Sequence, residues 1–157
     1  MPKLPATQPD MPSITFEVSQ ANDAEALVAL RIEAMRESLE RIGRFDPVRA
    51  RERFLNGFAP ERTHHILLRG ERVGFYVLTA QEDGLMLNHL YIRPGHQGQG
   101  VGAFVLAHIF KQADATGQDV RLGALRGSAS NRFYLAHGFV KVDEAEFDLY
   151  YLRRPRQ

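Results

Sequence analysis

The chain has 157 residues, of which 25% are charged and 44% hydrophobic, and its formal net charge is +1. This length favours a single domain, and the balanced charge excludes the strongly basic profile of a nucleic-acid-binding protein. Cysteine is absent, which excludes disulfides, thiolate metal sites and a cysteine nucleophile.

Two further classes are excluded by hydropathy. No hydrophobic run approaches the ~20 residues that a membrane-spanning helix needs, and the first twelve residues, MPKLPATQPDMP, lack the hydrophobic core of a secretion signal. We therefore expect a cytoplasmic protein with a flexible lead-in at residues 1–12, one domain at 13–153 and a tail at 154–157.

The first half of the chain predicts two helices and four strands. Residues 13–18 alternate hydrophobic and polar side chains, which is typical of a strand. Hydrophobic residues at helical spacing follow up to Gly43, and Asp46 with Pro47 begins a second helix that ends between residues 56 and 58. The remaining strands are separated by turns at Gly70 and at residues 81–84, and we place them at 63–69, 72–80 and 85–92.

The second half predicts two more helices and three more strands. The helices lie at about 100–116 and within 128–138, and the strands lie at 119–125, 139–144 and 146–154. The order is therefore β-α-α-β-β-β-α-β-α-β-β. Turns make the second, third and fourth strands antiparallel, whereas a helix makes the fourth and fifth parallel with a right-handed crossover. The sequence predicts an α/β (α+β) fold with a mixed, mostly antiparallel seven-stranded sheet and four helices.

The segment RPGHQGQGVG, at residues 93–102, joins the fourth strand to the third helix and contains four glycines. A helix N-terminus offers unpaired N–H groups and a partial positive charge, and glycines let the backbone approach a phosphate closely. Gly102 precedes Ala103 and Phe104 instead of Lys and Ser or Thr, which excludes a P-loop. The antiparallel strands before the loop, and Asp119 at the start of the next strand, argue against a dinucleotide-binding fold.

Two motifs carry a resemblance to a known family. Gln97-x-x-Gly100-x-Gly102 resembles the pyrophosphate arm of the GCN5-related N-acetyltransferase (GNAT) superfamily. Tyr134, followed by Gly138 and Phe139 in NRFYLAHGFVKV, resembles its second signature. The resemblance covers about residues 13–153. It implies an acetyl-CoA-dependent N-acetyltransferase, whose acetyl-CoA lies between splayed fourth and fifth strands.

The resemblance also implies a set of cofactor-binding residues. The backbone of the fourth strand would bind the pantetheine amides, through Leu90, Tyr91 and Ile92. The amides of the glycine loop would bind the pyrophosphate, through Gln97, Gly98, Gln99, Gly100, Val101 and Gly102. Asn131 is a further candidate, although the family's asparagine usually lies at the position that Gly127 occupies here.

For catalysis, the resemblance implies that Tyr134 is the general acid that protonates the departing thiolate. A packed aromatic residue is the alternative interpretation. The position of the family's frequent glutamate base is taken by Met86, so His89 is the candidate base. Strand alternation predicts that Asn88 and His89 lie on opposite faces of the sheet. The backbone N–H of Leu90 is the candidate oxyanion donor.

The predicted acceptor is a small-molecule or peptide amine, which attacks acetyl-CoA directly in a ternary complex. Neither nucleic acid nor a membrane is expected to take part. No metal is expected either, because His64 and His65 alternate across a strand and form a poor metal pair. A homodimer is left open. The family's acceptor usually contacts the first two helices, where the candidates are Glu33, Arg36, Glu37, Arg44 and Phe45. The missing glutamate keeps open an alternative, a non-catalytic acyl-CoA-binding module of the same fold.

Overall fold

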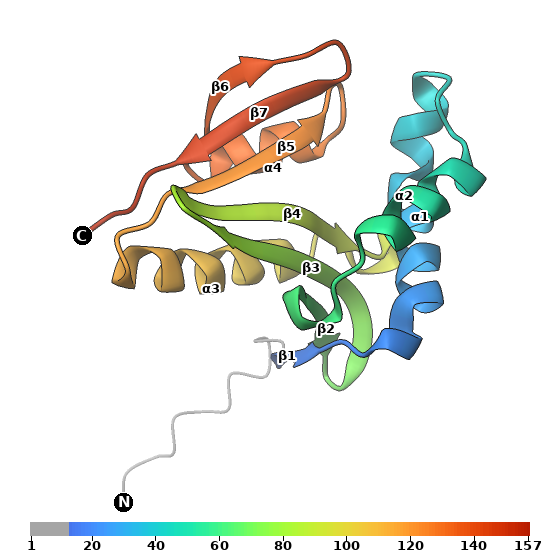
Figure 1. Ribbon diagram of the computed structural model, residues 1–157, viewed down its shortest axis with the longest axis horizontal. Coiled ribbons are helices and arrows are strands. Elements are labelled where there is room, and N and C mark those ends of the chain that lie inside the picture. The colour runs from blue at the N-terminus through green and yellow to red at the C-terminus, as the bar shows by residue number, and fades with distance from the viewer. Residues whose placement is uncertain (1–12) are drawn as a thin grey trace, which may run out of the picture.

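The helices and strands of the computed structural model lie within a few residues of their predicted positions (Figure 1). The model describes residues 13–157, so the lead-in predicted for residues 1–12 lies outside the described residues. The helices are α1 (Ala24–Arg41), α2 (Pro47–Gly57), α3 (Val101–Ala115) and α4 (Ser130–Ala136). The strands are β1 (Ile14–Val18), β2 (Thr63–Leu68), β3 (Glu71–Gln81), β4 (Gly84–Ile92), β5 (Val120–Leu125), β6 (Val140–Glu144) and β7 (Asp148–Arg153).

All seven strands form one sheet in the order β1-β2-β3-β4-β5-β7-β6. Strands β1 to β4 are an antiparallel meander, and β4 pairs with β5 in parallel. The predicted mixed sheet with four helices is therefore confirmed. One feature was not predicted: β7 lies between β5 and β6 and is antiparallel to both.

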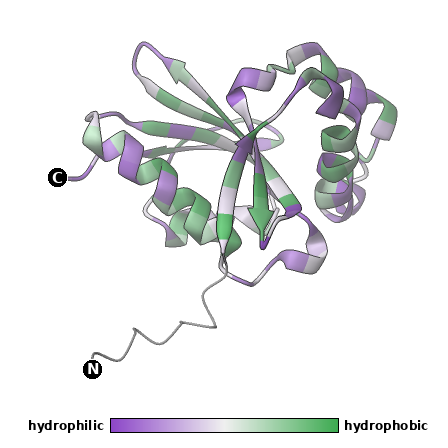
Figure 2. Cartoon of the chain, turned by 90° about the horizontal axis from the view of Figure 1, so that it is seen from below, coloured by the Kyte–Doolittle hydropathy of each residue, from purple (hydrophilic) through white to green (hydrophobic). Residues whose placement is uncertain are grey.

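Helices cover both faces of this sheet (Figure 1). On one face α3 buries Val105, Leu106 and Ile109 completely. On the other face, Leu27 of α1 and Phe54 of α2 belong to a separate hydrophobic cluster. The helices alternate hydrophobic and hydrophilic residues along their length (Figure 2), as expected where one side packs on a sheet. None of the helices within residues 13–157 is long and hydrophobic enough to span a membrane.

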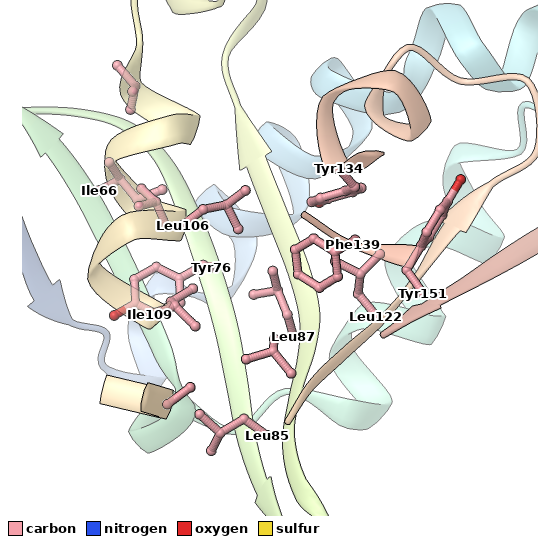
Figure 3. Packing of buried hydrophobic residues seen from close by; sticks show 14 of the residues in the cluster. Ile66, Tyr76, Leu85, Leu87, Leu106, Ile109, Leu122, Tyr134, Phe139 and Tyr151 are labelled. Atoms are coloured by element: carbon pink, nitrogen blue, oxygen red, sulfur yellow. The ribbon is translucent and has the colours of Figure 1, made fainter. Parts of the chain in front are cut away.

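Strands β4 and β5 separate after a short stretch of pairing. Their parallel register covers only Leu85–Leu87 with Val120–Leu122. Beyond that point β4 continues along β3 to Ile92, whereas β5 continues along β7 to Leu125. The two strands are therefore splayed, as predicted, and their facing edges lack mutual hydrogen bonds. At the closed end, Leu87, Leu122 and Phe139 fill the space between them (Figure 3).

A β-bulge interrupts β4 at the point where the strands separate. Val77 of β3 pairs with His89, but the next residue, Leu78, pairs with Leu87. Asn88 is therefore an extra residue without a partner on β3. Because side chains alternate between faces along a regular strand, one extra residue reverses the alternation beyond it.

The bulge places Asn88 and His89 on the same face of the sheet. Leu87 and Leu90 both belong to the core beneath α3, although regular alternation over three residues would put them on opposite faces. His89 turns to the other face, where its ring centroid lies 5.7 Å from that of Phe54. The prediction that Asn88 and His89 lie on opposite faces is wrong, because it assumed an uninterrupted strand.

Candidate active site

A pocket of about 600 Å³ opens where β4 and β5 separate. Its walls come from α1, the second half of β4, the glycine loop, the end of β5 and α4. The predicted site residues that line it are His89, Leu90, Tyr91, Ile92, Gln97, Gly98, Gly100, Val101, Gly102 and Tyr134. Gln99 and Asn131 are not among the lining residues. The pocket therefore brings together the glycine loop and the three candidate catalytic groups.

The glycine loop has a backbone that only glycine adopts readily. Gly98 and Gly100 have φ angles of +77° and +80°, and Gly100 immediately precedes the first residue of α3, Val101. A Cβ atom at either glycine would meet no other atom within 4 Å. The loop is held to the strand by Gln97, whose Nε2 donates to the carbonyl of Ile92 at 2.9 Å. Open space beside left-handed glycines at a helix N-terminus fits a phosphate group.

The edge of β4 that faces β5 offers free backbone groups. Arg93 donates its N–H to the carbonyl of Val73 on β3, at 2.8 Å. In an antiparallel ladder every second residue bonds to the same neighbour, so Tyr91 also points toward β3. Leu90 and Ile92 then direct their backbone groups into the gap. Leu90 and Ile92 therefore remain candidates for backbone contacts with pantetheine, and Tyr91 does not. For Ile92 only the N–H is available, because its carbonyl accepts from Gln97.

Tyr134 is buried, with 7% of its surface exposed, and lines the pocket from α4. Its ring packs against Phe133 and Phe139, with centroids 5.4 and 5.5 Å away. Within residues 13–157, its hydroxyl forms no hydrogen bond. Burial, and then the nearby phenol of Tyr91, raise the pKa of Tyr134. The hydroxyl therefore stays protonated at neutral pH and is free to donate a hydrogen bond into the pocket.

His89 lines the same pocket from β4. Its Nδ1 lies 3.3 Å from the hydroxyl of Tyr91, a side chain that the sequence analysis did not single out although it lies two residues along the same strand. Burial, and then the positive charge of Arg31, lower the pKa of His89 to about 4. The imidazole is therefore neutral at pH 7 and can accept a proton, although it is a weak base.

The low pKa of His89 predicts a specific pH dependence of stability. In the unfolded chain this histidine has a pKa near ~6.5, so the unfolded state binds more protons than the folded state between about pH 6.5 and 4. Stability should therefore fall as the pH is lowered through this window, by about 2 kcal/mol between pH 7 and pH 5 from this residue. Urea unfolding of wild type and His89→Gln at both pH values measures the difference. An equal loss in the two proteins would contradict the burial of His89.

Asn131, a candidate cofactor contact, does not line the pocket and forms its hydrogen bonds within the protein. Its Nδ2 donates to the carbonyl oxygens of Leu125 and Ser128, at 2.8 and 3.0 Å, and its Oδ1 accepts from the hydroxyl of Tyr151 at 2.8 Å. The side-chain amide of Asn131 thus donates a hydrogen bond to the backbone carbonyl at the end of β5, where the strand leaves the sheet. We therefore do not retain Asn131 as a cofactor contact.

The acceptor candidates on and after α1 are mostly engaged elsewhere. Arg36 pairs with Glu40, and the guanidinium of Arg44 lies 3.7 Å from the ring centroid of Phe147. Only one of the five candidates lines the pocket, namely Glu37. Within residues 13–157, no group of three or more His, Asp or Glu side chains could hold a metal ion.

Comparisons with known proteins identify the family and the fold of the chain. The family model described as an acetyltransferase (GNAT) domain matches residues 60–141, which is 82 of the 157 residues. The chain belongs to the GNAT family. No curated protein matches the sequence, so the most informative relatives of this GNAT protein are solved structures.

Those structures share the GNAT fold at low sequence identity. The PaiA N-acetyltransferase of Thermoplasma acidophilum, in complex with coenzyme A, is 18% identical with a TM-score of 0.74, covering 90% of this chain and 99% of that one. The ribosomal-protein-S18-alanine N-acetyltransferase of Escherichia coli is 16% identical with a TM-score of 0.65, covering 92% and 96%. The N-acetylglutamate synthase of Neisseria gonorrhoeae, with coenzyme A and N-acetyl-glutamate, is 21% identical with a TM-score of 0.63, covering 92% of this chain and 36% of that one.

Proposed function

We propose that the protein is an acetyl-CoA-dependent N-acetyltransferase, in which a primary amine attacks the thioester directly within a ternary complex. The observation that carries the proposal is the gap between β4 and β5, which opens onto the left-handed glycines at the start of α3. Membership of the GNAT family supports it. So do the structures of two neighbours that hold coenzyme A, PaiA and the N-acetylglutamate synthase.

Three parts of the chain would hold acetyl-CoA. The carbonyl of Leu90 and the N–H of Ile92 would bond the pantetheine amides as an additional strand would. The N–H groups of the glycine loop, from Gln97 to Gly102, would surround the pyrophosphate. The N-terminus of α3 would add a partial positive charge beside it.

Three groups in the pocket suit the chemistry. A free amine must lose a proton in the reaction, and the neutral imidazole of His89 is placed to accept it. The N–H of Leu90 would donate to the oxygen that becomes negative as the amine attacks. Tyr134 would donate a hydrogen bond to the departing sulfur. Because a thiol has a pKa of ~8.5, well below that of the buried phenol, we expect Tyr134 mainly to hydrogen-bond to the thiolate and not to transfer its proton fully. Since the chain has no cysteine, a cysteinyl acyl-enzyme is excluded.

Thermal unfolding with and without cosubstrates tests the proposal. A ligand present at one hundred times its dissociation constant adds about 2.7 kcal/mol to the free energy of unfolding. We expect acetyl-CoA to raise the melting temperature, and NAD and ATP to raise it much less. The absence of a shift with acetyl-CoA would contradict the cofactor assignment.

A non-catalytic acyl-CoA-binding module is the second candidate. It is favoured by Met86 at the position of the family's glutamate and by the low pKa of His89. Thiol release from acetyl-CoA, measured across a panel of amines, separates the two functions. Binding of acetyl-CoA without thiol release on any amine would identify the module.

A further inference from the structure

A second cavity, of about 320 Å³, lies on the face of the sheet that α1 and α2 cover. It shares Asn88 and His89 with the larger pocket, so the bulge of β4 forms a common wall. Thr79, which also lines this cavity, donates to Oδ1 of Asn88 at 2.6 Å and so holds that side chain in the wall. A molecule bound in the second cavity would therefore lie against the candidate base.

Three arginines from separate elements line this cavity: Arg31 on α1, Arg53 on α2 and Arg62 just before β2. Within residues 13–157, none of the three forms an ion pair, whereas seven of the other fourteen arginines of these residues do. No acidic side chain of the described residues lines the cavity. Three positively charged side chains therefore line the cavity, without an ion-pair partner among the described residues.

Arg31 is the most deeply placed of the three. One of its terminal nitrogens donates to the carbonyl of Ala50 at 3.2 Å, which fixes the guanidinium between α1 and α2. Its Nε is buried and has no hydrogen-bond partner. A buried donor without a partner is unfavourable, and an oxyanion is the group that a guanidinium fork binds best.

We propose that this cavity binds the anionic end of the acceptor, so that the preferred acceptor is a small amine that also carries a carboxylate or a phosphate group. This inference rests on the proposed acetyltransferase function. The volume is at the lower end of the range for small-molecule sites, which suits a metabolite. Phe54, Phe58 and Val77 supply an apolar wall for a short carbon chain between the anion and the amine.

The same arrangement couples acceptor binding to His89. The charge of Arg31 contributes to the lowered pKa of His89. An anion on Arg31 would offset that charge and make the imidazole a better proton acceptor. An anionic acceptor would thus gain in both binding and proton transfer, whereas a neutral amine would gain in neither.

Thiol release with matched amines tests the inference. We expect kcat/KM for O-phosphoethanolamine to exceed that for ethanolamine, or kcat/KM for β-alanine to exceed that for its amide, by about tenfold or more, because hydrogen bonds to a charged group are stronger than those to a neutral one. The first pair tests phosphate and the second tests carboxylate. Arg53→Gln/Arg62→Gln should abolish the preference by raising KM for the anionic amine only.

Arg49→Gln is the matched control, because Arg49 is exposed on the same helix and does not line the cavity. An anionic preference that is absent, or that survives intact in Arg53→Gln/Arg62→Gln, would overturn the inference while leaving the acetyltransferase function standing. A neutral peptide amine that is acetylated as well as the anionic amines by both proteins would also overturn it.

A binding measurement covers the case in which no amine is acetylated. Inorganic phosphate is titrated calorimetrically into the protein with coenzyme A already present. Binding that Arg53→Gln/Arg62→Gln weakens at least tenfold, and that Arg49→Gln leaves unchanged, would support an anion site even if the catalytic proposal fails. Phosphate that binds at the glycine loop would not respond to these substitutions, and an unchanged affinity would overturn the inference.

Discussion

Replacing Tyr134 with phenylalanine is expected to lower kcat by about one hundredfold, while the dissociation constant of acetyl-CoA changes little. The hydroxyl is the only group lost, and a positioned acid contributes typically 10²–10⁴-fold. Because the raised pKa of Tyr134 makes it mainly a hydrogen-bond donor, we expect the lower end of that range. Steady-state thiol release gives kcat, and calorimetry with coenzyme A gives the affinity. An unchanged kcat would remove Tyr134 from the mechanism.

Tyr151→Phe is the control for this substitution. The two tyrosine rings lie near each other, with centroids 6.4 Å apart, and both are buried. The hydroxyl of Tyr151 donates to Asn131 instead of entering the pocket. Tyr151→Phe should therefore cost about 1 kcal/mol of stability, the usual value for a lost hydrogen bond, and leave kcat unchanged. A similar loss of kcat in both variants would indicate a general effect on packing.

Replacing Gly100 with valine is expected to weaken acetyl-CoA binding by about one hundredfold. Valine does not adopt a φ of +80° without strain, so the loop must change its backbone and its N–H groups turn away from the pyrophosphate. Loss of one hydrogen bond to a charged group, at ~1.5–3 kcal/mol, accounts for an effect of this size. Calorimetric titration with coenzyme A measures it.

Gly117→Val separates backbone strain from loss of the site. Gly117 follows α3 with a φ of +66°, and a Cβ there would meet no atom within 4 Å, as at Gly100. It does not line the pocket. Both substitutions should lower stability by about 1–2 kcal/mol, but only Gly100→Val should lower the affinity. Equal affinities in the two variants would show that the glycine loop does not bind the cosubstrate.

The element order and the glycine loop could be predicted from the sequence because they depend on local patterns. Hydrophobic periodicity, caps and turns act over a few residues, and they placed each helix and strand within a few positions of its bounds. The glycine loop was found from residue type, but which of its glycines are left-handed was not predicted: Gly98 and Gly100 have positive φ, whereas Gly95 and Gly102 do not. Tyr134 was found through its spacing from Gly138 and Phe139 in a family motif.

The face on which His89 lies, by contrast, was decided by the tertiary structure. The bulge at Asn88 is an irregularity in the pairing of β4 with β3, and nothing in residues 85–92 alone shows where the extra residue falls. Likewise, the free backbone groups of Leu90 follow from the register with β3, which the sequence does not state. Asn131 was a candidate although the family's asparagine usually lies at the position of Gly127, and in the structure its side-chain amide donates to the carbonyl of Leu125 at the end of β5.

The sequence by itself predicted the family, the order of helices and strands and the glycine loop, because each is encoded in short segments whose residues interact with near neighbours. Only the tertiary structure brought Arg31, Arg53 and Arg62 to one cavity beside His89. These arginines come from three separate elements, and no acidic residue among residues 13–157 lines the cavity with them. The proposed acceptor preference therefore depends on long-range packing, whereas the glycine loop of the proposed cosubstrate site is encoded in one short segment.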